Sequence, residues 1–124
     1  MRKITKHIIH CSASNGGNVT RIREWHKARG WKDVGYHFII RQDGEIEVGR
    51  TMDIIGAHCK GHNTESISTC LIGDLHFSQA QFASLRRVHA MLESLFPNIE
   101  AYPHNHFNKH KTCPNFDIKE VLYL

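Results

Sequence analysis

Histidine and cysteine side chains gather in one polar stretch near the C-terminus, His104-Asn-His-Phe-Asn-Lys-His-Lys-Thr-Cys113-Pro114. Imidazole nitrogen and thiolate sulfur are common zinc ligands in proteins. His104 and Cys113 stand nine positions apart in a segment that Pro114 closes and that is too irregular for a helix face. We expect a third ligand from His10, because the end of a short apolar strand presents side chains on a rigid scaffold. Two histidines and one cysteine leave a fourth position open, which is typical of catalytic zinc.

The same stretch offers alternatives to this ligand set. His106 and His110 compete with His104, since either could reach the ion from the loop, and with a fourth protein ligand the site would be structural. The chain has eleven histidines, so most of them must have no role in catalysis. We interpret four of them as surface or helix-face residues: His7, His26, His76 and His89.

The composition is that of one soluble globular domain spanning residues 1–124. Hydrophobic residues make up 40% and charged residues 23%, and no apolar run approaches the length of a membrane span. The basic N-terminus is not followed by a signal-peptide core, so we expect synthesis in the cytoplasm and reduced cysteines. Of the four cysteines, Cys113 is predicted to be a ligand and Cys70 a core residue. Cys11 is expected to point away from the ion and to pack. The net charge of +4 favours anionic partners.

The first elements must position His10. Residues 4–10 read as a short strand and residues 11–18 as a polar loop that ends in a helix N-cap, Asn18. Apolar residues at helical spacing predict a helix over 19–29, with Gly30 as its C-terminal cap. Residues 36–41 and 45–49 predict a β-hairpin around Asp43-Gly44. Strand alternation then places Tyr36 on the same face as Phe38 and Ile40.

The second half of the chain must position the polar stretch. Residues 51–65 read as a long loop and 66–72 as a central strand. A capping-box pattern and an apolar stripe predict a helix over 78–96. Residues 99–102 are expected to form a last strand and 116–124 a short helix. This order predicts an α/β domain with a mixed sheet of about five strands flanked by helices, and a zinc site in a groove at the sheet edge.

Several short motifs, taken together, resemble one family over residues 8–117. They are Ile9-His-Cys-Ser-Ala13, Trp25-His-Lys27, Gly30-Trp31, Asp33-Val-Gly-Tyr-His-Phe-Ile-Ile40, Asp43-Gly44, Gly49-Arg50, Gly56-Ala-His58, Lys60-Gly61, Asn63, Ser66-Ile67 and Lys111-Thr-Cys-Pro-Asn-Phe-Asp117. The sequence is similar to the zinc N-acetylmuramoyl-L-alanine amidases, and in particular to small phage amidase lysozymes related to peptidoglycan recognition proteins.

This resemblance implies one zinc ion per chain, held by His10, His104 and Cys113. It implies that Tyr36 and Lys111 are catalytic and that His58 contacts the substrate. The loop from His104 to Cys113 is one residue longer than in many family members. The implied reaction is hydrolysis of the amide between N-acetylmuramic acid and the L-alanine of the stem peptide.

The resemblance also implies a biological setting. A phage enzyme of this kind stays in the host cytoplasm until it is released to the cell wall, and a monomer without nucleic-acid binding or membrane insertion is expected. The alternatives are a peptidoglycan-binding module that does not cut, and a regulator that binds a phage RNA polymerase, with or without catalysis.

Overall fold

The computed structural model describes residues 2–14, 16–28 and 34–123. The elements in chain order are β1 (Lys6–Cys11), α1 (Val19–Ala28), β2 (Phe38–Ile40), β3 (Ile46–Val48), β4 (Ser66–Leu71), α2 (Gln79–Leu95), β5 (Glu100–Pro103), the 3₁₀ turn η1 (His104–His106) and α3 (Ile118–Leu122). Each predicted helix and strand is therefore present, with boundaries that differ by a few residues.

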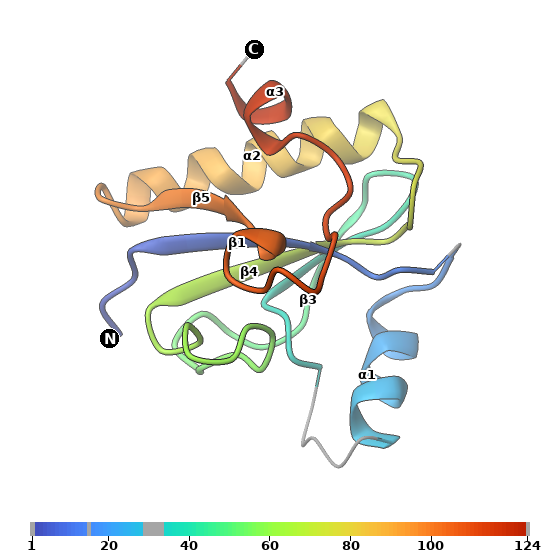
Figure 1. Ribbon diagram of the computed structural model, residues 1–124, viewed down its shortest axis with the longest axis horizontal. Helices are drawn as coiled ribbons and strands as arrows, with labels where there is room; N and C mark the ends of the chain where they lie inside the picture. Colours follow the sequence, from blue (N-terminus) through green and yellow to red (C-terminus); the bar gives the residue numbers. More distant parts are fainter. Residues whose placement is uncertain (1, 15, 29–33, 124) are drawn as a thin grey trace.

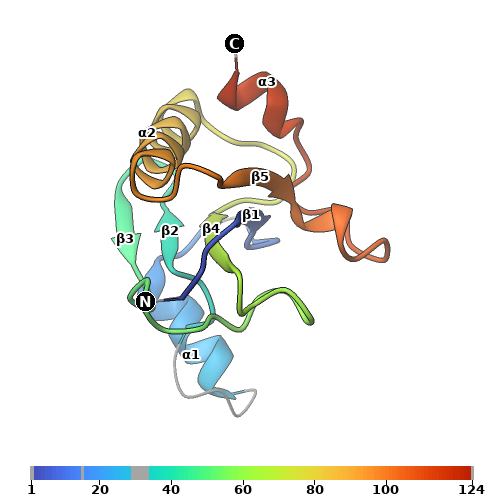
Figure 2. The same cartoon turned by 90° about the vertical axis from the view of Figure 1, so that its left-hand side faces the viewer.

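The five strands form one mixed sheet in the order β3-β2-β4-β1-β5. β1 pairs in parallel with β4 and β5, and β2 pairs in parallel with β4 but antiparallel with β3. Figures 1 and 2 show α2 and α3 on one side of the sheet, with α1 and the loop that precedes β4 on the other. The predicted α/β class and five-stranded mixed sheet are confirmed.

The main core lies between the sheet and α2. Leu85, Val88 and Leu92 of α2 are buried in the same cluster as Ile9 of β1 and residues of β2, β4 and α3. The helix begins with the predicted capping box: the Ser78 hydroxyl accepts from the Gln81 N–H, and the Gln81 side chain accepts from the Ser78 N–H. Burial of this apolar stripe fixes the sheet that carries the site.

A second, smaller cluster lies under α1. Ile22 is buried against Val34, Ile39, Cys70 and Ile72, while Val19 and Trp25 pack at its margin. The Asn18 side chain accepts from the Arg21 N–H, so the predicted N-cap is confirmed. The predicted cap at Gly30 lies outside the described residues.

The hairpin is shorter than predicted, and this changes the position of Tyr36. Gly44 occupies the turn with φ +88, where an added Cβ would also approach Ala80 to 2.9 Å. Regular pairing starts only at Phe38, so alternation cannot be extended back to Tyr36. Phe38 lies in the main core, whereas Tyr36 packs against the cluster under α1. The predicted shared face for these two residues was wrong.

Three histidines expected on the surface or on helix faces are in fact buried: His7, His26 and His89. His7 and His89 stack with ring centroids 5.1 Å apart, and the His26 Nδ1 accepts from the Gly35 N–H. Hydrogen bonds to protein partners offset the cost of removing a neutral imidazole from water. Composition alone does not reveal such partners. His76 is exposed, as predicted. Within the described residues, no helix is both long and apolar enough to cross a membrane.

Candidate active site

His10 and His104 meet because of the register between β1 and β5. Ile9 lies opposite Pro103 in this parallel pair, so the residues that follow each of them are neighbours at the carboxyl ends of the strands. The two imidazole ring centroids are 4.3 Å apart, and both side chains are buried. β5 is an edge strand, so the pair lies at the edge of the sheet.

Cys113 joins this pair from the loop after η1. The Asn105 N–H donates to the Cys113 carbonyl at 3.0 Å, which folds the loop back toward η1. The Cys113 Sγ lies 2.9 Å from the Cys11 Sγ. The hydrogen bond between the two thiols lowers the pKa of the Cys113 thiol; burial opposes this shift, and a hydrogen bond with His104 lowers the pKa further. A lowered pKa favours the thiolate form of Cys113, which is the form that binds metals.

The position of Cys11 differs in part from the expectation. Its side chain is buried, as a packing role requires, but its sulfur points at Cys113. The loop that carries Cys113 crosses the end of β1, and strand alternation within β1 cannot predict that contact. The hydrogen bond with Cys113 raises the pKa of the Cys11 thiol.

The other two histidines of the stretch lie elsewhere. His106 is exposed and packs on Tyr102 and Phe107, with ring centroids 5.1 and 4.9 Å away. His110 is exposed in the loop. Of the three histidines, His104 alone contacts the His10 ring within the described part of the chain.

Tyr36 borders the histidine pair from the side of α1. Its ring centroid lies 5.1 Å from that of His10 and 5.4 Å from that of His26. Burial, and after it the nearby cysteine thiols, raise the pKa of the phenol well above its ordinary value. Tyr36 is therefore a protonated hydrogen-bond donor at neutral pH.

Lys111 lies in the same loop as Cys113, with an exposed side chain. Its backbone N–H donates to the Asn108 carbonyl at 3.0 Å, which closes a turn. This turn fixes the backbone of Lys111 two residues before Cys113, while the four-carbon side chain extends from the surface.

His58 reaches the site from the long loop between β3 and β4. Its Nδ1 lies 2.9 Å from His10 Nε2, and its Nε2 lies 3.1 Å from the Ser66 hydroxyl. Gly56 permits this approach, because an added Cβ would lie 2.7 Å from the His58 ring and 2.9 Å from the Gly35 carbonyl. Both ring nitrogens of His58 are therefore occupied by protein partners, and the contact with substrate remains a prediction.

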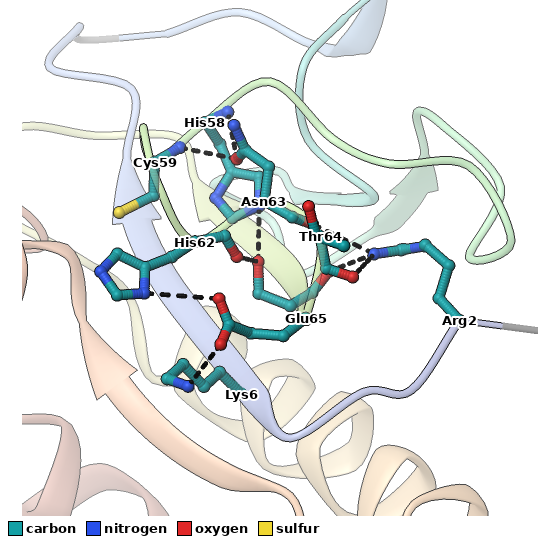
Figure 3. Close-up of polar contacts among 9 residues, drawn as sticks. Arg2, Lys6, His58, Cys59, His62, Asn63, Thr64 and Glu65 are labelled. Atoms are coloured by element: carbon teal, nitrogen blue, oxygen red, sulfur yellow. Dashed lines mark hydrogen bonds and ion pairs between the residues drawn. The ribbon is translucent and has the colours of Figure 1, made fainter.

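Two residues that hold this loop were not singled out from the sequence (Figure 3). The Arg2 guanidinium donates to five backbone carbonyls, those of Met52, Ile54, Asn63, Thr64 and Ser66. Lys6 pairs with Glu65 at 2.9 Å. Ser66, whose hydroxyl contacts His58, belongs to the Ser66-Ile67 motif and could have been found from it. A single arginine near the N-terminus carries no comparable signal.

The donor set suits zinc by its chemistry. Two imidazoles and one thiol prepared for deprotonation are its preferred ligands, and the contacts run from His10 to His104 and from His104 to Cys113. Among the described residues, no group of three such side chains lies in ligating positions, and the Cys113 Sγ contacts the Cys11 Sγ. Binding of zinc by Cys113 would replace that hydrogen bond.

Comparison with known proteins gives consistent results. The profile of the N-acetylmuramoyl-L-alanine amidase family matches residues 1–116. The endolysin of Escherichia phage T7 is 43% identical over 122 residues, covering 90% of this chain and 80% of the relative. The endolysin of Enterobacteria phage K11 is 38% identical, covering 95% and 85%. The structure of the N-acetylmuramoyl-L-alanine amidase LysC from Clostridium intestinale superposes with a TM-score of 0.91 at 28% identity, covering 97% of this chain and 83% of that one.

Proposed function

This chain belongs to the N-acetylmuramoyl-L-alanine amidase family, and we propose that it uses a zinc ion held by His10, His104 and Cys113. It is a peptidoglycan hydrolase of the phage endolysin type, which cleaves the amide between N-acetylmuramic acid and the L-alanine of the stem peptide. The family is generally zinc-dependent. The observation that carries the zinc assignment is the 4.3 Å approach of the His10 and His104 rings, beside the loop of Cys113.

When bound, zinc would supply a water of pKa about 7 and polarise the scissile carbonyl. The role of the chain is to orient the substrate and to stabilise charge. Hydrolysis of an amide places negative charge on the former carbonyl oxygen, and a donor aimed at that oxygen lowers the barrier. Tyr36, protonated and beside His10, is the candidate donor within the site. We assign Lys111 the matching role of a cation that approaches the oxyanion from the loop.

The substrate is expected to lie across the surface around His58. A depression of about 330 Å³ is lined there by residues 57–61 and Asn63, and a smaller one of about 80 Å³ lies between α1 and Tyr36. The polar residues His58, Lys60 and Asn63 in the lining of the larger depression suit a glycopeptide. Lys60, which is exposed there, would attract the carboxylates of the stem peptide.

The zinc-loaded chain is tested on purified peptidoglycan, with released fragments identified by mass spectrometry. We expect free stem peptides that begin at L-alanine, intact glycan strands and no release after removal of zinc with a chelator. A Cys113→Ser variant should behave like the stripped protein, and a variant of the exposed His76, His76→Leu, like the wild type. Cleavage of the glycan strands, or retention of the polymer without release of peptides, would contradict the proposal.

A further inference from the structure

The hydrogen bonds around His58 determine which ring nitrogen of His10 can face a metal. Ser66 has one hydroxyl proton, and its Oγ donates that proton to the His62 carbonyl at 2.7 Å. The contact between the Ser66 Oγ and the His58 Nε2 must then have the ring N–H as donor. A neutral imidazole carries only one N–H, so the His58 Nδ1 is an acceptor.

The same reasoning extends to the next ring. Because the His58 Nδ1 accepts, the 2.9 Å contact with His10 must be a hydrogen bond donated by the His10 Nε2–H. The lone pair of His10 is then on Nδ1. His10 is buried and His58 is half-buried against other histidine rings, surroundings that favour the neutral form of both.

Hydrogen bonds within the loop hold the first two groups of this series, the His62 carbonyl and the Ser66 hydroxyl, in place (Figure 3). The Asn63 side chain accepts from the backbone N–H groups of His58 and Cys59 at 3.1 and 2.9 Å. The Arg2 Nη1 donates to the carbonyls of Asn63 and Ser66, at 3.1 Å in each case. A carbonyl can only accept, so while the backbone holds the His62 carbonyl against the Ser66 hydroxyl, Ser66 must be the donor in that contact.

We propose that a relay of four groups, the His62 carbonyl, the Ser66 hydroxyl, His58 and His10, holds His10 in the tautomer that presents Nδ1 to zinc. His58 is thus a positioning residue for a metal ligand, and the proposal rests on the zinc assignment of the proposed function. Outer partners of this kind fix the ring orientation of metal-bound histidines, and their loss typically weakens metal binding by about 10–100-fold.

The first test requires no substitution. Nitrogen-15 NMR of the histidine rings in the metal-free full-length chain distinguishes the two neutral tautomers. We expect the proton of His10 on Nε2 and that of His58 on Nε2. In a Ser66→Ala variant, His58 loses its acceptor, and part of the population should move its proton to Nδ1. A proton on Nδ1 of His10 in the wild type would overturn the relay.

The second test measures the zinc dissociation constant by competition with a chelator of known affinity. His58→Leu removes the acceptor and should weaken binding by about 10–100-fold. His58→Asn keeps an acceptor oxygen near the position of Nδ1 and should recover much of that loss. The control His76→Leu changes an exposed histidine outside the relay and should bind zinc like the wild type.

Thermal unfolding of each metal-free variant separates a loss of fold from a loss of orientation. Wild-type affinity in His58→Leu, together with lost affinity in His10→Ala, would overturn the relay and leave the ligand assignment intact. Wild-type affinity in His10→Ala would instead overturn the ligand assignment itself, and the relay with it.

Discussion

Replacing Tyr36 by phenylalanine removes one hydroxyl and leaves the aromatic ring in place. The ring packs against the cluster under α1 and lies 5.1 Å from the His10 ring, so its apolar contacts are kept. Because the pKa of the phenol is raised, the wild-type group is a donor at every pH at which the enzyme would be assayed. The substitution thus removes a hydrogen-bond donor rather than a charge.

The magnitude follows from the role assigned to that donor. Loss of one donor to a developing oxyanion costs about 3 kcal/mol, or roughly a 100-fold fall in kcat. Ground-state binding does not depend on that charge, so KM should change far less. Since the ring remains, the free energy of unfolding should change by no more than about 1 kcal/mol.

The assay is the rate of stem-peptide release from purified peptidoglycan, with zinc content and urea unfolding measured on the same samples. His76→Leu, at an exposed site, is the control for nonspecific effects. A Tyr36→Phe enzyme with full zinc content and wild-type kcat would refute the donor role. A fall in kcat that only matches lost zinc would show instead that Tyr36 supports the metal site.

The remaining predictions concern the ligand set, the core and pH. His104→Ala should lose bound zinc, measured by mass spectrometry of the dialysed protein, whereas the exposed His106→Ala should retain it; the reverse result would exchange their roles. Leu92→Ala, at a fully buried position of α2, should cost about 2–5 kcal/mol in urea unfolding. Leu95→Ala, at a position that is 52% exposed, should change stability by about 0.5 kcal/mol or less, and equal effects would contradict the packing described. Burial lowers the pKa of His37 to about 4. In the pH range from about 4 to about 6.5, the unfolded chain therefore binds more protons than the folded chain. The stability of the metal-free protein should therefore be fully present above pH 6.5 and decline as the pH falls toward 4; a urea midpoint that is constant from pH 7 to 5 would contradict this.

The helices were predictable because their signals are local. Ser78 and Gln81 form a capping box three residues apart, and the apolar stripe that follows repeats at the helical period. Asn18 marks the start of α1 in the same way. Such patterns are complete within one element, so no knowledge of the neighbouring elements is needed.

The position of Tyr36 was not predictable from its strand. Alternation holds only while the backbone stays extended and paired, and regular pairing begins at Phe38. The side chain instead follows the path of the preceding segment into the cluster under α1. The contacts of His58 were likewise hidden, since its partner His10 lies 48 positions away and both are brought together by tertiary packing.

The histidine pair depends on register more than on the spacing within either motif. His10 and His104 are neighbours because Ile9 lies opposite Pro103, and a slip of one residue would move one histidine along the sheet and turn its side chain to the other face. The loop to Cys113 can absorb an extra residue, as loops do, because its ends are fixed by η1 and by the contact with Cys11. The one-residue difference in loop length is therefore compatible with the ligand role that we propose for His104, whereas a change in the pairing of β1 with β5 would separate His104 from His10.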